Sequence, residues 1–198
     1  MTWAYLIERL LKTFRDPRGG ARWVLSHDLP IRTCWEILLL VTVVSTAIAV
    51  GAEAIGAAEP VLVFGVAGES FTLFLGLINL VALFLAALLI YSIGAAAGGK
   101  GDLKGAVLLV AWLQSVLIFL QLVQFLAVLV LPPLAGLIGI FALVMLFWLP
   151  TNFIAELHGF QSLPAVFASI FFASFVLLLI VSVILTVLGM ELVVGPGV

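Results

Sequence analysis

The chain has 198 residues, of which 65% are hydrophobic and only 9% are charged, and its formal net charge is −2. Soluble domains carry about 25% charged residues, so a soluble fold could not cover this much apolar surface. Residues 105–190 hold a single formally charged side chain, that of Glu156. The composition therefore predicts an all-α, polytopic integral membrane protein. It also excludes the basic excess that would neutralise a nucleic-acid backbone.

Residues that bind metals or carry out catalysis are scarce. There is one cysteine, Cys34, and two histidines, His27 and His158, which excludes a disulfide framework and a multi-cysteine metal site. The sequence contains no zinc-hydrolase motif, no serine-hydrolase elbow and no complete phosphate-binding loop. We therefore expect a protein that is not an enzyme and uses no metal and no cofactor.

The first predicted element is an amphipathic helix over residues 2–15. Its apolar residues recur at helical spacing, and they are Trp3, Leu6, Ile7, Leu10, Leu11 and Phe14. Charged residues, among them Arg9 and Lys12, occupy the opposite side, and we expect Pro17 with Gly19-Gly20 to end the helix. Such a helix suits a membrane surface containing anionic lipid. A helix packed on the bundle is the alternative.

Five segments are apolar and long enough to cross about 30 Å of hydrocarbon, or nearly so. The expected spans are residues 35–54, 71–92, 106–131, 134–149 and 164–190. Pro132-Pro133 forces a break after the third span, and the short fourth span can borrow residues at either end. Residues 61–67 are too few to cross, and we expect a loop or an interfacial segment there.

The cations predict the orientation. Six of the eight precede the first span, and the other two, Lys100 and Lys104, lie between the second and third spans. Because cytoplasmic loops are enriched in Lys and Arg, this distribution predicts that the N-terminus is cytoplasmic and the C-terminus outside. We expect a cytoplasmic segment over residues 1–30, a five-helix domain over 31–192 and an outside tail over 193–198. The first span starts too late to be a removable signal.

Polar side chains inside the expected spans are few. They are Asn79 on the second span and Gln114, Gln121 and Gln124 on one face of the third. Interhelical hydrogen bonds are their usual role. The alternative is a polar seam between the second and third helices that takes a lipid headgroup or a small polar solute. Small residues spaced for close helix contact favour a compact bundle or a homo-oligomer.

A second candidate site lies on the expected cytoplasmic face, and it comprises Gly98, Gly99, Glu156, His158 and Gly159. Glu156 and His158 form the only titratable pair in the C-terminal half. On a helix, residues two apart do not face each other, whereas in an extended segment they share a side. We expect a solvated interfacial loop here, and the functional alternative is a proton-linked or headgroup-binding site.

Several short motifs carry a resemblance over about residues 30–190. They are Tyr91-Ser92-Ile93-Gly94, Gly98-Gly99-Lys100-Gly101, Ala111-Trp112, and Glu156-Leu157-His158-Gly159-Phe160 with Ala165. With five spans, the chain resembles the Yip domain family, the Ypt/Rab-interacting membrane proteins and their bacterial relatives. The resemblance implies a five-span bundle with a cytosolic N-terminus.

The resemblance also implies a class of function. Eukaryotic members are described as binding small GTPases and acting in vesicle traffic, and they usually carry Asp-Leu-Tyr-Gly-Pro and Gly-Tyr motifs. This chain has neither motif, so it fits a prokaryotic member better, and the resemblance then implies a bacterial cytoplasmic (inner) membrane. We expect a non-enzymatic protein that organises membrane or partner proteins, in contact with anionic lipid, a membrane-protein partner or a second copy. A small transporter or lipid-moving protein that uses the polar seam is the alternative.

Overall fold

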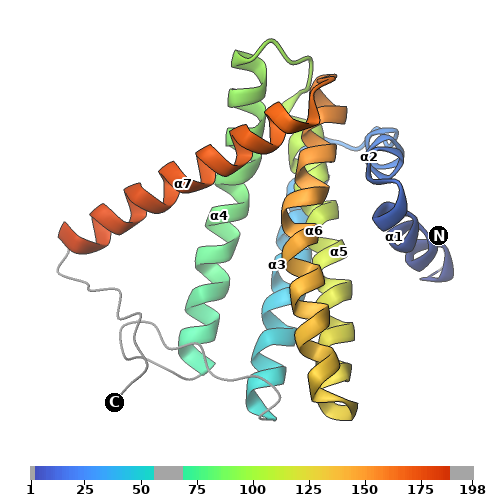
Figure 1. Ribbon diagram of the computed structural model, residues 1–198, viewed down its shortest axis with the longest axis vertical. Helices are drawn as coiled ribbons and strands as arrows, with labels where there is room; N and C mark the ends of the chain where they lie inside the picture. The colour runs from blue at the N-terminus through green and yellow to red at the C-terminus, as the bar shows by residue number, and fades with distance from the viewer. Residues whose placement is uncertain (1–2, 56–68, 188–198) are drawn as a thin grey trace.

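The computed structural model describes residues 3–55 and 69–187, and in these residues every regular element is an α-helix (Figure 1). The helices are α1 (Trp3–Arg15), α2 (Pro17–Leu25), α3 (Ile31–Ala54), α4 (Glu69–Ala96), α5 (Leu103–Val130), α6 (Pro132–His158) and α7 (Leu163–Val187). The expected interfacial segment 61–67, the end of the fifth span and the tail 193–198 lie outside the described residues. The expected all-α membrane fold is confirmed.

Four helices have the length and hydropathy of membrane spans. These stretches are Ile31–Ala54, Gly76–Ala96, Leu103–Val130 and Pro132–His158, with mean hydropathy between 2.1 and 2.4. The fifth expected span corresponds to α7, in which the apolar stretch found among the described residues, Leu163–Phe175, is shorter than a span. Helix α7 packs against α6 and runs obliquely to the other helices (Figure 1).

Helix α5 is the centre of the bundle. It packs against α3, α4 and α6, and half of its span is buried, against 6% of the α4 span. Most of the buried positions at its start are small or β-branched, including Ala106, Val107 and Ala111. Small side chains let helix backbones approach closely in a membrane, where packing rather than water exclusion drives association. The outer helices therefore present most of their apolar surface outward, as lipid requires.

Helix α6 is longer than the sequence predicts. Pro132-Pro133 ends α5 as expected, but the same prolines form the first turn of α6, where a missing N–H costs nothing. The helix then continues through Pro150 to His158, so the loop expected at residues 152–160 is wrong for its first seven residues. Proline normally breaks backbone hydrogen bonds in a helix interior.

Side chains next to Pro150 bond to the carbonyls of the preceding turn. The Thr151 hydroxyl donates to the Phe147 carbonyl at 2.7 Å, and the Asn152 amide donates to the Trp148 carbonyl at 2.8 Å. Pro150 has no N–H for the carbonyl four residues before it, that of Leu146, and the two side-chain bonds add donors to the next two carbonyls of the same turn. The helix ends instead at Gly159, whose φ of +75° is the left-handed conformation that glycine adopts without strain.

The glycine pair near the N-terminus lies inside a helix, which corrects its expected role as a terminator. Helix α1 ends at Arg15, and Asp16 caps α2 by accepting the Gly19 N–H at 2.8 Å. A Cβ at Gly20 would lie 2.7 Å from the Thr13 hydroxyl oxygen. Glycine at this position therefore lets α2 pack closely against α1.

Helix α1 is docked on the bundle through one face. The fully buried Thr13 hydroxyl accepts a hydrogen bond from the Trp112 indole N–H at 3.2 Å and donates to the Arg9 carbonyl. The Phe14 ring packs between those of Phe119 and Phe141, at centroid distances of 6.4 and 5.8 Å. The alternative expected for α1, a helix packed on the bundle, therefore holds for the part of its apolar face that carries Phe14.

Both groups of cations lie at one end of the bundle, which we call the basic end. Here α2, the turn between α4 and α5, and the C-terminal end of α6 meet (Figure 1). The Lys104 ammonium lies 2.7 Å from the Asp28 carboxylate and joins the start of α5 to the segment after α2. This contact holds the pKa of the Asp28 carboxyl below its usual value, chiefly by hydrogen bonding.

Replacing Thr13 with Val keeps the shape of the side chain but leaves the Trp112 indole N–H without its acceptor. We expect the free energy of unfolding in detergent to fall by about 1–3 kcal/mol. Trypsin should also cut the cation-rich α1 faster, because α1 undocks more often. Thr13→Ser, which retains the hydroxyl, should behave close to wild type. Equal behaviour of the Val and Ser variants would contradict this docking role.

Candidate functional site

His158 is buried at the last turn of α6, with both imidazole nitrogens bonded to backbone. Its Nδ1 lies 3.3 Å from the Gly101 amide nitrogen, and its Nε2 lies 3.1 Å from the Ile90 carbonyl oxygen. An amide only donates and a carbonyl only accepts, so this network assigns the neutral tautomer with the proton on Nε2. The expected solvated loop position is wrong for this residue, which is 2% exposed.

Three glycines make the space for this imidazole, and we call Gly94, Gly99 and Gly101 the glycine cradle. A Cβ at Gly94 or at Gly99 would overlap the His158 ring, and one at Gly101 would lie 2.6 Å from the Leu157 side chain. The His158 carbonyl also accepts the Lys100 N–H at 3.2 Å. The turn after α4 therefore packs around the end of α6.

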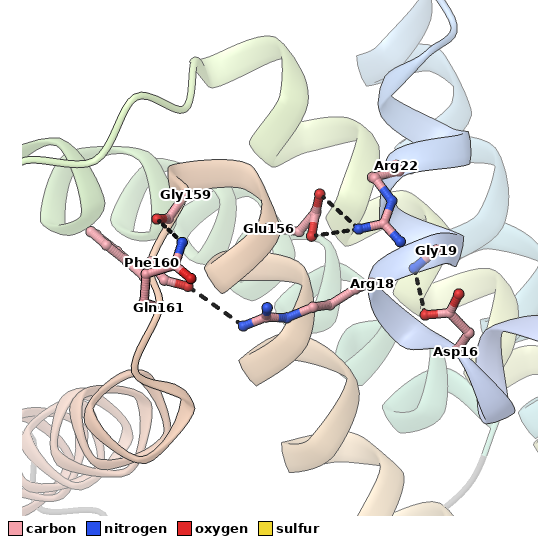
Figure 2. A network of polar contacts seen from close by, with 8 residues as sticks. All are labelled: Asp16, Arg18, Gly19, Arg22, Glu156, Gly159, Phe160 and Gln161. Carbon is pink, nitrogen blue, oxygen red and sulfur yellow. Dashed lines mark hydrogen bonds and ion pairs between the residues drawn. The ribbon is translucent and has the colours of Figure 1, made fainter.

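Glu156 faces α2 instead of His158. Its two carboxylate oxygens lie 3.4 and 3.3 Å from Nη1 of Arg22 (Figure 2). Nearby, Arg18 donates to the Phe160 carbonyl at 3.5 Å. No hydrogen bond joins Glu156 to His158 in the part of the chain that the structure describes, as their spacing on a helix requires. The segment is helical, so the shared side that an extended segment would give these two residues is not formed.

The contact between α2 and α6 is weak in energetic terms. The Arg22 side chain is 59% exposed, whereas that of Glu156 is 20% exposed. Ion pairs of this kind contribute about 0–1 kcal/mol and are screened by salt. The N-terminal helix pair is therefore held mainly by buried contacts, those of Thr13 and Phe14 on α1 and of Ala21 and Val24 on α2.

The remaining members of the expected cytoplasmic-face site line the same turn. Gly98 adopts a φ of +82° with open space around it, and Gly99 belongs to the cradle. The exposed Gly159 ends α6, and its carbonyl accepts from Gln161 (Figure 2). The structure therefore brings four of the five residues around one turn, while Glu156 points to another element.

The four amides of the expected polar seam are dispersed. Gln121 accepts a hydrogen bond from the Ser45 hydroxyl on α3 at 3.1 Å, so it faces the first span rather than the second. Gln124 lies 3.0 Å from the position of a Cβ at Gly139 on α6. Gln114 is buried and Asn79 half-buried. Among the described residues no hydrogen bond joins any two of the four, so they form no common hydrogen-bonded cluster.

The apolar face of α1 is divided between bundle and exterior. Leu10 and Phe14 pack against the core, and Leu6 is half-buried. Ile7 and Leu11 are 45% and 49% exposed, although they lie on the same helix. The side chain of Trp3 lies outside the described part of the chain. Two apolar side chains of the docked helix thus remain available to lipid or to another protein.

An aromatic cluster joins α1 and α2 to the bundle, and the sequence analysis missed it. The Trp23 ring lies 6.1 Å from that of Tyr5 and 5.1 Å from that of Trp112. The guanidinium carbon of Arg9 lies 5.0 Å from the Tyr5 ring centroid and 5.2 Å from that of Trp23. No periodic signal marks these residues, because they come from three different helices.

Among the described residues, no group of three or more His, Cys, Asp or Glu side chains is placed to hold a metal ion. The family model of the Yip1 domain matches residues 11–185. The chain belongs to the Yip1 domain family. Comparisons with curated proteins and with solved structures give no match.

The Yip1 match covers the whole glycine cradle, α2 and the final turns of α6. The expected family is thereby confirmed, while membership of a prokaryotic branch stays a prediction. In this Yip1 domain, three of the motifs that suggested the family come together at His158, through Gly94, through Gly99 and Gly101, and through the last turn of α6. They lie on three separate segments, and His158 is the atom-level link between them.

Replacing Gly94 with Ala places a methyl group on the His158 ring. Overpacking of this kind costs about 1–3 kcal/mol, and we expect a matching fall in the free energy of unfolding of the Yip1 domain. The double variant Gly94→Ala/His158→Ala should recover part of the loss, because the ring is gone. The non-additivity of this double-mutant cycle is the measurement.

Gly51→Ala is the matched control, since nothing lies within 4 Å of its added Cβ. It should leave stability unchanged or slightly raised, because Ala favours a helix. Additive effects of Gly94→Ala and His158→Ala would show that the two residues are not coupled.

Proposed function

We propose that this Yip1-domain protein is non-enzymatic and organises the membrane, or partner proteins within it, through α1 and α2 at the basic end. The observation that carries the proposal is the division of the α1 apolar face. One half docks the helix on the bundle, and Ile7 and Leu11 remain exposed. A helix that presents apolar residues at this spacing suits a membrane surface or a groove on another protein.

The depth of α1 supports a position at the membrane surface. Helix α5 has 28 residues and is about 42 Å long at 1.5 Å per residue, which exceeds about 30 Å of hydrocarbon. Its first turns can therefore rise above the hydrocarbon. Trp112, which contacts Thr13 of α1, lies about two and a half turns into α5. Tryptophan prefers the interfacial level, which favours that level for the part of α1 around Thr13. Phe14 reaches further, to Phe119 about four and a half turns into α5, so this end of α1 extends below the surface.

The titratable groups at the basic end support a structural role. Both nitrogens of His158 are engaged by backbone, and the Glu156 carboxylate is paired with Arg22. A general acid or base needs a free proton site near its substrate. These residues therefore supply architecture at the end where α2 docks.

The orientation belongs to the same proposal. The cations gathered at the basic end favour a cytoplasmic location for that end, with the C-terminus outside, in a bacterial inner membrane. In this proposal residues 1–30 form a cytoplasmic interfacial segment. It precedes the membrane domain over residues 31–192. A partner protein or a second copy of the chain would approach from the cytoplasmic side.

Affinity purification from native membranes in a lipid-preserving environment tests the organising role. We expect a stoichiometric protein partner to copurify with the wild type. The double variant Ile7→Gln/Leu11→Gln should reduce its recovery about tenfold, because two exposed apolar contacts are lost. Mass spectrometry quantifies the retained proteins.

Ile7→Leu/Leu11→Ile is the matched control, since it keeps the apolar surface, and it should retain the partner. Unchanged recovery with the Gln variant would refute the role of α1. Crosslinks to a partner that involve only other parts of the bundle would also refute the role of α1.

A further inference from the structure

A small basic cleft lies between α1 and α2. Its volume is about 220 Å³, which is below the roughly 300–1,000 Å³ of pockets for drug-sized ligands. Three cations line it, Arg9, Lys12 and Arg15, together with Asp16, Trp23 and the backbone of Gly19 and Gly20. The size and the charge both suit a compact anion.

Arg9 is held in place with most of its donors unused. Its Nε donates to the Tyr5 hydroxyl at 3.0 Å, and its guanidinium lies over the rings of Tyr5 and Trp23. A guanidinium has five N–H donors, and the other four make no hydrogen bond to any residue that the structure describes. A positioned fork of free N–H groups is the geometry that binds phosphate with two parallel hydrogen bonds.

The other charges leave the cleft positive. Lys12 lies 2.6 Å from Glu8, a residue outside the lining, and this contact lowers the pKa of the Glu8 carboxyl. Arg15 forms no ion pair with any described residue. Asp16 is the one carboxylate among the lining residues, and its Oδ1 already accepts the Gly19 N–H as the cap of α2. Three cations and one carboxylate give the lining a net charge of +2, which becomes +1 when Glu8, the partner of Lys12, is counted.

The glycine pair sets how closely α2 approaches Asp16 and α1 beside the cleft. A Cβ at Gly19 would overlap the Asp16 carboxylate, and one at Gly20 would press on Thr13. Both positions therefore present bare backbone to the cleft. The pair that resembles a helix terminator in the sequence thus shapes a cavity between two helices.

We propose that the cleft between α1 and α2 binds the phosphate group of an anionic ligand, either a lipid headgroup or a free phosphate. The inference rests on the proposed function and deepens it, since it names the chemistry that α1 and α2 recognise at the membrane surface. The exposed Ile7 and Leu11 on α1 favour the lipid source. They lie next to the cleft in sequence and suit the acyl region below a headgroup.

The test uses the full chain in nanodiscs, with two arms. In the first, discs contain phosphatidylcholine and phosphatidylglycerol, and mass spectrometry measures which lipid stays on the protein after detergent extraction. In the second, discs contain phosphatidylcholine alone, and added inorganic phosphate is followed by phosphorus NMR line width. Retention of phosphatidylglycerol indicates the lipid source, and broadening of the phosphate signal indicates the free anion. Either result supports the cleft if the variants below abolish it.

Arg9→Gln/Arg15→Gln should weaken binding about tenfold or more, because charge-assisted hydrogen bonds are lost. The double variant Lys12→Gln/Arg15→Gln should also weaken binding. It leaves the packed Arg9 in place and changes only exposed side chains. Lys100→Gln removes one charge outside the cleft, at an exposed position, and should change binding less than twofold. An equal loss with Lys100→Gln, or no binding in either arm, would overturn the inference.

The cleft variants leave Ile7 and Leu11 intact, which separates the two proposals. If the partner is recovered but no phosphate binds, only the proposal about the cleft is refuted. If phosphate binds but substitution of Ile7 and Leu11 does not change the recovery of the partner, only the proposed organising role is refuted.

Discussion

The basic end depends on one buried imidazole. His158 accepts from the turn after α4, donates to the Ile90 carbonyl on α4, and receives the Lys100 N–H at its own carbonyl. These three bonds join α4, the α4–α5 turn and α6. They form only because Gly94 and Gly99 leave room for the ring. Since an unpaired buried polar group is costly, the whole set is kept or lost together.

The orientation of the N-terminal helices follows from that arrangement. With His158 fixed toward the bundle, helical geometry turns Glu156 to the opposite side, where Arg22 of α2 meets it. Helix α2 then brings α1 against Trp112 and Phe119. Two kinds of contact hold the pair, an exposed ion pair and buried contacts that combine apolar packing with the Thr13–Trp112 hydrogen bond. The Yip1 domain therefore carries its amphipathic helix as a docked part of the bundle.

Composition and periodicity were sufficient for the fold class and for α1, because lipid demands long apolar helices and a surface helix repeats every 3.6 residues. They failed where a distant or local side chain compensates for a breaker. Helix α6 continues through Pro150, with extra side-chain bonds from Thr151 and Asn152 to the preceding turn. The contact of Gly20 with Thr13 depends on how α1 and α2 lie against each other. The cradle was visible only as a family likeness, since its glycines lie about 60 residues from His158.

The link between α5 and α6 bears on how the chain enters the membrane. A single residue, Leu131, separates the two helices, and they lie side by side with their turn at the end away from the basic end (Figure 1). Residues 105–155 carry no charged side chain. Translocating this turn therefore moves no ion through hydrocarbon, and so short a link favours entry of both helices as one hairpin. The insertion free energy of that hairpin is set by its apolar side chains and its backbone.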